Sequence, residues 1–135
     1  MPKRKVVLTG ASGTIAGVLL PALRERYDLT LLDSRAKDRH GVAVDGVQIA
    51  DLMDKDRDRY RHHFAGADAV VHCAYFRVQD QGDDAYFSSE LENLQLTYNV
   101  YQVAWEEGVR RLVAASTNHA ATYWRIMRSM GAYRW

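Results

Sequence analysis

The sequence predicts an α/β fold in which helices cover both faces of a doubly wound parallel sheet of about five strands. Five short segments are rich in aliphatic and β-branched residues and lack polar–apolar alternation, which is typical of strands buried on both faces. Helical patterns lie between most of these segments, so the expected order along the chain is β-α-β-β-α-β-α-β. Strands that alternate with helices in this way favour a parallel sheet.

Each expected strand is a short apolar run that ends at a glycine or a polar residue. The expected strands are Lys5–Thr9, Tyr27–Asp33, Val47–Leu52, a run within Asp68–Phe76, and Arg110–Thr117. The expected helices are Thr14–Arg26, the charged segment Lys55–Phe64, and Ala85–Glu107, which Gly108 stops. Pro21 falls inside the first helix and permits a kink or an early end there. The polar segments Ser34–Gly46 and Arg77–Asp84 are expected to be loops.

Length and composition limit the class of protein. At 135 residues the chain has the size of one domain, and its net charge of +1 gives no reason to expect nucleic acid or an anionic membrane as a partner. Cys73 is the only cysteine, which excludes an internal disulfide and predicts a cytoplasmic protein. Polar residues from Thr9 to Thr14 interrupt the apolar run that follows the basic N-terminus, so a secretory signal is poorly formed. No apolar run approaches the roughly 18 residues of a membrane helix.

A glycine-rich turn joins the first expected strand to the first expected helix, in the stretch VVLTGASGTIAG. Gly10 permits a tight turn, Gly13 lets the backbone approach a pyrophosphate, and the small Ala16 lets the helix pack on the strand. The N-terminus of the helix offers free N–H groups and a partial positive charge to phosphates. This strand–turn–helix pattern predicts a dinucleotide-binding site.

Asp33 lies twenty residues after Gly13, at the end of the second expected strand. A carboxylate at this place binds the hydroxyls of the adenine ribose and repels a 2′-phosphate, which favours NAD over NADP. Arg35 weakens this preference, because a nearby arginine is able to hold that phosphate. The alternative interpretation is an ordinary glycine turn followed by an ordinary surface aspartate.

Five motifs in chain order resemble the extended short-chain dehydrogenases/reductases of the NAD-dependent epimerase/dehydratase family. TGASGTIA resembles the glycine turn of that family, ADL (Ala50–Leu52) the acidic dipeptide beside the adenine, and VVHCAY (Val70–Tyr75) the strand end along the cofactor. NLQLTYNV (Asn93–Val100) is similar to the N-x-x-x-T-x-N-V helix, and LVAASTNHA (Leu112–Ala120) to the fifth strand, in a form most like uronate dehydrogenases. The resemblance spans roughly residues 5–123 and implies the Rossmann-type N-terminal part of such an enzyme.

The resemblance also implies which residues act in binding and chemistry. Ser116 and Thr117 match the active-site hydroxyl, and Asn118 and His119 would line the pocket for a sugar-type substrate. NAD is the implied cofactor, with NADP less favoured. The implied cofactor contacts are Gly10, Ser12, Gly13, Thr14, Ile15, Asp33, Ser34, Asp51, Leu52, Cys73, Ala74, Tyr75 and Asn93.

The tyrosine and the lysine four residues later, which move the proton in this family, are missing. The only lysines are Lys3, Lys5, Lys37 and Lys55, and none of them lies four residues after a tyrosine. We therefore expect an NAD(P)-binding domain over residues 1–122 and an atypical or truncated tail over residues 123–135. Two hypotheses stay open: part of a sugar-oxidising or sugar-epimerising enzyme, or a non-catalytic dinucleotide-binding module.

The longest expected helix carries two apolar faces. Large, mostly aromatic residues follow one another at spacings of four and three residues, which places them on one stripe: Phe87, Leu91, Leu94, Tyr98, Tyr101 and Trp105. Leu96, Val100, Val103 and Ala104 fall on the opposite side and suit packing on a sheet. The resemblance implies a homodimer through helix 85–107. The alternative is that the C-terminal tail covers the aromatic stripe within one chain.

The remaining titratable residues give weaker signals. His62 and His63 are expected at the solvated surface, and no metal site is expected, because no other ligand accompanies them. His72 ends an apolar strand beside Cys73, and both are expected to serve in packing.

Overall fold

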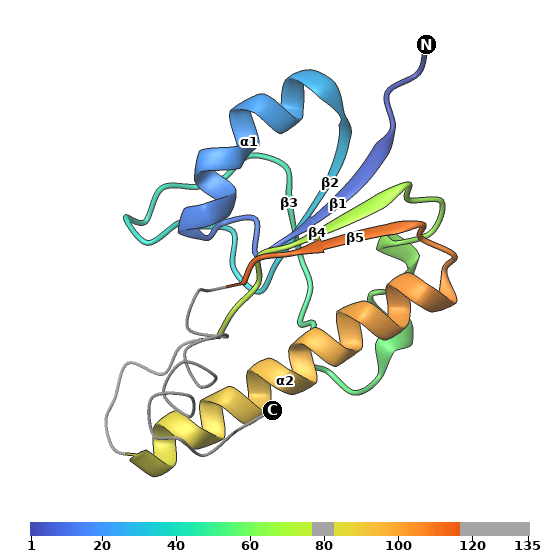
Figure 1. Cartoon of the computed structure of the whole chain (residues 1–135). Helices are drawn as coiled ribbons and strands as arrows, with labels where there is room; N and C mark the ends of the chain where they lie inside the picture. Colours follow the sequence, from blue (N-terminus) through green and yellow to red (C-terminus); the bar gives the residue numbers. More distant parts are fainter. Residues whose placement is uncertain (77–82, 117–135) are drawn as a thin grey trace, which may run out of the picture.

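A computed structural model describes residues 1–76 and 83–116. They form a five-stranded parallel sheet with the order β3-β2-β1-β4-β5, which confirms the Rossmann-type α/β class (Figure 1). The strands are β1 (Lys5–Thr9), β2 (Asp28–Asp33), β3 (Val47–Ile49), β4 (Ala69–His72) and β5 (Arg111–Ala114).

The two long helices cover opposite faces of the sheet (Figure 1). Helix α1 (Thr14–Arg26) buries Ala16 and Leu20 against side chains of β1 and β2 on one face. Helix α2 (Asp83–Glu106) buries an aliphatic face against the other side of the same strands, and the core there includes Val7 and Val70. Because strands β1 and β4 have apolar neighbours above and below, they read as continuous apolar runs in the sequence.

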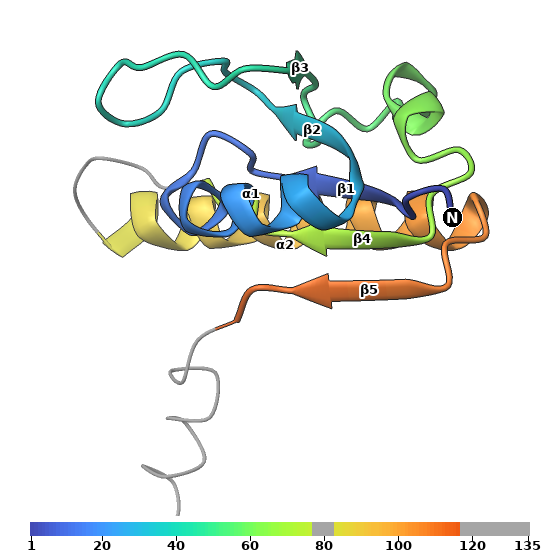
Figure 2. The same cartoon turned by 90° about the horizontal axis from the view of Figure 1, so that it is seen from above.

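Strand β1 lies at the centre of the sheet, between β2 and β4 (Figure 2). The chain runs from β1 to β2 and β3 on one side, and then crosses to β4 and β5 on the other. Thr9, the last residue of β1, pairs with Leu32 of β2 and with His72 of β4. The point where the strand order reverses is therefore between β1 and β4, and ligands bind at the carboxyl ends of strands at such a point.

The charged segment Lys55–Phe64 does not form the expected helix. It contains two short 3₁₀ turns, Arg57–Arg59 and Arg61–His63. Two aspartates explain the difference: the Asp54 carboxylate accepts a hydrogen bond from the N–H of Asp56 at 2.9 Å, and the Asp56 carboxylate accepts one from the N–H of Asp58 at 3.3 Å. Each bond closes a local turn between a side chain and the N–H two residues later, and such turns offer the backbone an alternative to the α-helix.

Several boundaries also differ from those expected. Strand β3 ends at Ile49 and β5 at Ala114, so both are shorter than the apolar runs that predicted them. Helix α1 continues through Pro21 to Arg26. Helix α2 begins at Asp83, within the segment that was expected to be a loop. In the part of the chain that the structure describes, no helix is both long and apolar enough to cross a membrane.

Candidate functional site

A cleft of about 760 Å³ opens at the carboxyl ends of the strands on both sides of β1. Its walls come from five segments: the glycine turn after β1, the end of β2, the segment after β3, the segment after β4, and helix α2. The lining residues are Gly10, Gly13, Asp33, Ser34, Arg35, Ala50, Asp51, Leu52, Met53, Cys73, Ala74, Tyr75, Phe76 and Leu96.

Gly10 allows the glycine turn to pass very close to the segment after β4. Its φ of +69° lies in the left-handed region, and a Cβ atom added there would lie 2.5 Å from the backbone nitrogen of Ala74. The N–H of Gly13 then donates to the Gly10 carbonyl at 2.9 Å and closes the turn. Gly13 is also the N-cap residue of α1. Because glycine has no side chain, the first N–H groups of the helix have no side-chain partner at this cap.

Asp33 links the glycine turn to the end of β2. Its Oδ2 accepts a hydrogen bond from the N–H of Ser12 at 3.0 Å, and its Oδ1 accepts one from the N–H of Arg35 at 3.2 Å. The N–H of Ala11 donates to the carbonyl of Leu32 at 3.1 Å. These bonds hold a carboxylate in the cleft wall directly beside the turn.

The segment after β3 brings a second carboxylate into the cleft. The N–H of Ala50 donates to the Asp33 carbonyl at 2.9 Å, which extends the pairing with β2 by one residue. Asp51 then turns the chain, because its Oδ1 accepts a hydrogen bond from the N–H of Met53 at 3.0 Å. This turn explains why β3 ends before Leu52.

His72 holds the ends of β1 and β4 together from inside the core. Its Nδ1 lies 2.7 Å from the hydroxyl of Thr9, and its Nε2 lies 3.4 Å from the hydroxyl of Thr97 on α2. Desolvation by burial lowers the pKa of His72 to about 4, so the ring is neutral near pH 7. The expectation that His72 serves in packing is confirmed by its burial.

Cys73 follows His72 and lines the cleft. Desolvation by burial raises the pKa of its thiol above the usual value, so the thiolate that would act as a nucleophile is disfavoured.

Asn93 reaches the segment after β4 from α2. Its Oδ1 accepts a hydrogen bond from the N–H of Phe76 at 2.6 Å, and its Nδ2 donates to the Phe76 carbonyl at 2.7 Å. The hydroxyl of Tyr75 in the same segment donates to the carboxylate of Glu90, also on α2. Both contacts fix the segment that forms one wall of the cleft.

The cleft brings together nine of the thirteen residues that were predicted to contact the cofactor. The other four lie next to it: Ser12 is buried in the glycine turn, Thr14 and Ile15 are exposed in the first turn of α1, and the amide of Asn93 is bonded to Phe76. For these four a direct contact with the cofactor stays a prediction.

Five lining residues were not among the thirteen predicted contacts: Arg35, Ala50, Met53, Phe76 and Leu96. Leu96 reaches the cleft from α2, and only the tertiary arrangement could reveal it. Phe76 ends VVHCAYF, the apolar run whose earlier residues were predicted, and that continuity is a signal that could have found it.

The predicted substrate and catalytic residues lie at or beyond the end of the described chain. Ser116 is exposed two residues after β5, and Thr117, Asn118 and His119 lie outside the described residues, as do residues 123–135. His62 is exposed and His63 is partly buried, and the pKa of His63 is lowered by desolvation and by the neighbouring His62. Within residues 1–76 and 83–116, no three His, Cys, Asp or Glu side chains gather as a metal site.

The chemistry of the cleft suits a dinucleotide. The N-terminus of α1 offers backbone donors where a pyrophosphate would lie, and the absent Cβ of Gly10 makes the close approach to Ala74 feasible. Asp33 offers carboxylate oxygens for ribose hydroxyls. Asp51 and Leu52 line the cleft from the segment after β3 and add a second carboxylate beside an apolar side chain.

Comparison with known proteins gives relatives that act on sugars or sugar acids. The chain is 33% identical to L-arabinose 1-dehydrogenase (NAD(P)(+)) of Haloferax volcanii over 90% of this chain and 44% of that protein. It is 27% identical to uronate dehydrogenase of Pseudomonas syringae pv. tomato over 98% of this chain and 46% of that protein. The chain thus spans less than half the length of the curated relatives that it matches.

Solved structures give the same result. Uronate dehydrogenase from Agrobacterium tumefaciens superposes with a TM-score of 0.67 and 28% identity, covering 88% of this chain and 42% of that chain. A mutant of that enzyme complexed with NAD superposes with a TM-score of 0.66. The profile of the NAD-dependent epimerase/dehydratase family matches residues 6–123, which include the glycine turn, both carboxylates of the cleft and helix α2. The chain belongs to the NAD-dependent epimerase/dehydratase family.

Proposed function

We propose that this chain is the NAD-binding part of an oxidoreductase or epimerase that acts on a sugar, a sugar acid or a nucleotide sugar. The observation that carries the proposal is the cleft at the point where the strand order reverses. Its lining includes the glycine turn and the carboxylates of Asp33 and Asp51. The family and the named substrates of its relatives support the substrate class. We place the protein in the cytoplasm, because its sole cysteine can form no internal disulfide.

Each wall of the cleft has a role in this proposal. The N-terminus of α1 binds the pyrophosphate, and Asp33 binds the hydroxyls of the adenine ribose. Asp51 accepts a hydrogen bond from the amino group of the adenine through Oδ2, since its Oδ1 is bonded to Met53. The N–H of Leu52, which no described residue accepts, donates to a ring nitrogen. The bound cofactor would supply the hydride acceptor.

We infer that NAD is preferred over NADP. The Asp33 carboxylate is held in place by two backbone N–H groups, and a 2′-phosphate beside it would bring two negative charges together. Arg35 also lines the cleft and acts in the opposite direction, because its guanidinium could pair with that phosphate. The cofactor preference is therefore the balance of these two side chains.

Isothermal titration calorimetry of residues 1–135 with NAD and with NADP tests the proposal. We expect NAD to bind with a dissociation constant of tens of micromolar, about 6 kcal/mol of binding free energy. Asp33→Asn should weaken NAD binding by about tenfold, or about 1.4 kcal/mol, and should reduce the preference for NAD. Asp28→Asn, at the other end of β2, is the matched control and should change neither affinity. A folded chain that binds neither dinucleotide would refute the proposal.

The second candidate function is a dinucleotide-binding module without catalysis of its own. The absence of any Tyr-x-x-x-Lys pair from the 135 residues favours it. Without that pair the chain lacks the acid–base group that, in the proposed reaction, takes the proton of the substrate hydroxyl. Both candidates share the NAD site, and they differ in whether residues 1–135 turn over a substrate.

We also propose that the chain forms a homodimer through the aromatic stripe of α2, which comprises Phe87, Leu91, Leu94, Tyr98, Tyr101 and Trp105. Each of these side chains is at least 43% exposed, whereas Leu96, Val100, Val103 and Ala104 on the other side are at most 5% exposed. Tyrosine and tryptophan are enriched in protein interfaces, and six large side chains on one stripe are more than a monomer surface commonly carries.

A further inference from the structure

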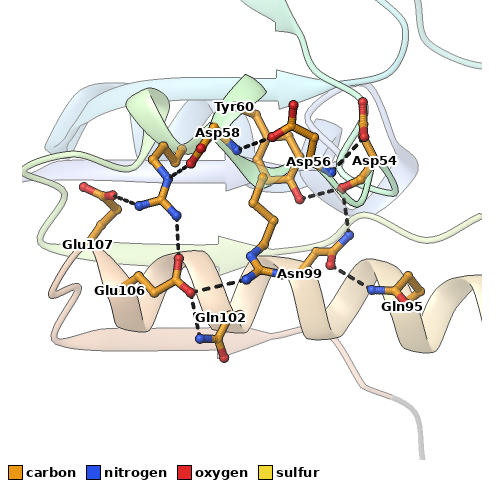
Figure 3. Close-up of polar contacts among 11 residues, drawn as sticks. Asp54, Asp56, Asp58, Tyr60, Gln95, Asn99, Gln102, Glu106 and Glu107 are labelled. Atoms are coloured by element: carbon orange, nitrogen blue, oxygen red, sulfur yellow. Dashed lines mark hydrogen bonds and ion pairs between the residues drawn. The ribbon is translucent and has the colours of Figure 1, made fainter.

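Asn99 is a polar side chain in the core, and it is fully buried between α2 and the segment that follows β3. Its Nδ2 donates hydrogen bonds to two backbone carbonyls, those of Leu52 at 2.9 Å and of Asp54 at 3.2 Å. Its Oδ1 accepts a hydrogen bond from the amide of Gln95 at 2.8 Å, one turn earlier on α2 (Figure 3). All the polar atoms of this amide group are therefore engaged.

The two carbonyls belong to the segment after β3, to which the proposed function assigns the adenine base. Asp51 and Leu52 line the cleft, and the chain turns sharply there. Asn99 bonds to this segment from the side on which α2 lies. Within the described chain, two other side chains donate hydrogen bonds to this segment. The Tyr60 hydroxyl donates to the Asp54 carbonyl at 3.1 Å (Figure 3), and Arg59 donates to the Asp54 carboxylate.

We propose that Asn99 is a positioning residue for cofactor recognition: by holding the carbonyls of Leu52 and Asp54, it orients Asp51 and the N–H of Leu52 toward the edge of the adenine base. This inference rests on the proposed NAD-binding function and adds a residue that does not line the cleft. Of the described residues, Asn99 is the one that connects α2 to both of these carbonyls.

The chemistry of the amide group explains why asparagine suits this position. One nitrogen with two N–H groups can serve two carbonyls two residues apart. A leucine of similar size would leave the buried Leu52 carbonyl without its side-chain donor and the Asp54 carbonyl with the Tyr60 hydroxyl alone. An aspartate would place a carboxylate against carbonyl oxygens. In either variant the segment must move to find other donors, and Asp51 moves with it.

The test compares two dinucleotides that differ only at the edge of the base. Nicotinamide hypoxanthine dinucleotide carries a 6-oxo group and a ring N–H where NAD carries an amino group and a ring acceptor. The hydrogen-bond donor and acceptor on the edge of the base that Asp51 and Leu52 recognise are thereby exchanged. We expect calorimetry to show that wild-type residues 1–135 prefer NAD by about tenfold, which is the effect of one mispaired polar edge.

In Asn99→Leu we expect NAD affinity to fall about tenfold and the preference over the hypoxanthine dinucleotide to fall to nearly one. Val103→Ala is the matched control, because Val103 is also fully buried on α2, one turn later. It should destabilise the fold and leave the preference unchanged, so a purely structural effect is separated from positioning. Tyr60→Phe removes only the hydroxyl that bonds Asp54, and it should lower the preference by a smaller factor even if Asn99→Leu fails to fold.

Three results would contradict the proposals in different ways. Unchanged preference in a folded Asn99→Leu chain would overturn the positioning role and leave the NAD site intact. If Asn99→Leu does not fold, unchanged preference in Tyr60→Phe would overturn it in the same way. A wild-type chain that binds neither dinucleotide would overturn the proposed function together with this inference.

Discussion

Gly10 is constrained by its own backbone and by the backbone of the segment after β4. A φ of +69° disfavours any side chain, and the added Cβ would lie 2.5 Å from Ala74 nitrogen and 2.6 Å from the carbonyl carbon of Cys73. Backbone atoms cannot swing aside as the end of a flexible side chain can. The glycine therefore sets how closely the turn approaches the segment after β4.

We expect Gly10→Ala to lower the free energy of unfolding by more than about 3 kcal/mol, because it combines a disfavoured φ with a backbone clash. Gly66→Ala is the matched control, since Gly66 has a φ of +68° and open space around it. It should cost only about 1 kcal/mol, the strain of the backbone alone. Urea denaturation of both variants gives the two values, and equal losses would show that the contact with Ala74 has no energetic effect.

His72 makes stability depend on pH. Its pKa is about 4 in the folded chain and about 6.5 when it is exposed, so the unfolded chain binds more protons between these values. Stability is therefore full above about pH 6.5 and is lost as the pH falls toward 4. Protonation also makes both ring nitrogens donors, so neither the hydroxyl of Thr9, 2.7 Å from Nδ1, nor that of Thr97 can then donate to the ring.

We expect the free energy of unfolding to fall by about 2 kcal/mol between pH 7 and pH 5 because of this one group. His72→Gln keeps a polar side chain but cannot titrate, and it should remove this part of the pH dependence while lowering stability at pH 7. Urea denaturation at both pH values, compared between the two chains, measures the difference. Equal slopes with pH would mean that His72 titrates normally in the folded chain.

At the scale of elements, the segment after β3 shows how local hydrogen bonds override composition. Lys55–Phe64 is charged and free of glycine and proline, which predicts a helix, yet Asp54 and Asp56 bond nearby N–H groups and leave two 3₁₀ turns. Arg61 then bridges to α2, with Nη2 2.6 Å from Glu106. The Gln102 amide, together with Arg57 and Arg61, lowers the pKa of the Glu106 carboxyl.

For α2, by contrast, the spacing of apolar residues alone was sufficient to predict which face packs on the sheet. The aliphatic side was predicted to pack on the sheet, and its burial confirms this. A helix of 24 residues has a strong periodicity, so the face that each residue occupies is fixed by its position. What covers the aromatic stripe depends on a second surface, which the spacing within one helix does not specify.

We expect residues 1–135 to sediment as a dimer at high micromolar concentration and Tyr98→Glu with Trp105→Glu to sediment as a monomer. Two carboxylates on the aromatic stripe would have to be buried in the interface, which is strongly unfavourable. Val18→Glu with Ala22→Glu adds the same charges to the exposed side of α1 and should leave the dimer intact. A wild-type chain that is monomeric under these conditions would contradict the dimer.

At the scale of the whole molecule, the sequence predicted the sheet and most of the cleft. The glycine turn and Asp33 were found because each belongs to a local pattern that ends a strand, whereas Asp51 was found through the resemblance of Ala50–Leu52 to a family motif. Leu96, and the bonds from Asn99 to Leu52 and Asp54, depend on where α2 crosses the sheet. Contacts between residues more than forty positions apart leave no trace in local spacing, which explains why these were missed.

We expect residues 1–135 by themselves to oxidise no sugar at a measurable rate, because the tyrosine–lysine pair is absent and such acid–base groups contribute about 10²–10⁴-fold. The assay follows NADH absorbance with NAD and galacturonate, glucuronate, L-arabinose or nucleotide sugars. Uronate dehydrogenase from Agrobacterium tumefaciens is the positive control. A robust rate that Thr117→Ala abolishes would contradict this expectation.

The central place of β1 has a consequence for the order in which the molecule is completed during synthesis. β1 precedes the other described strands in the chain, yet Thr9 pairs with His72, 63 residues later. At about 5–20 residues per second this partner is made about 3–13 seconds after β1. Until then one edge of β1, which is buried from Val6 to Thr9 in the folded chain, is open to other nascent chains, and early aggregation would begin at residues 5–9.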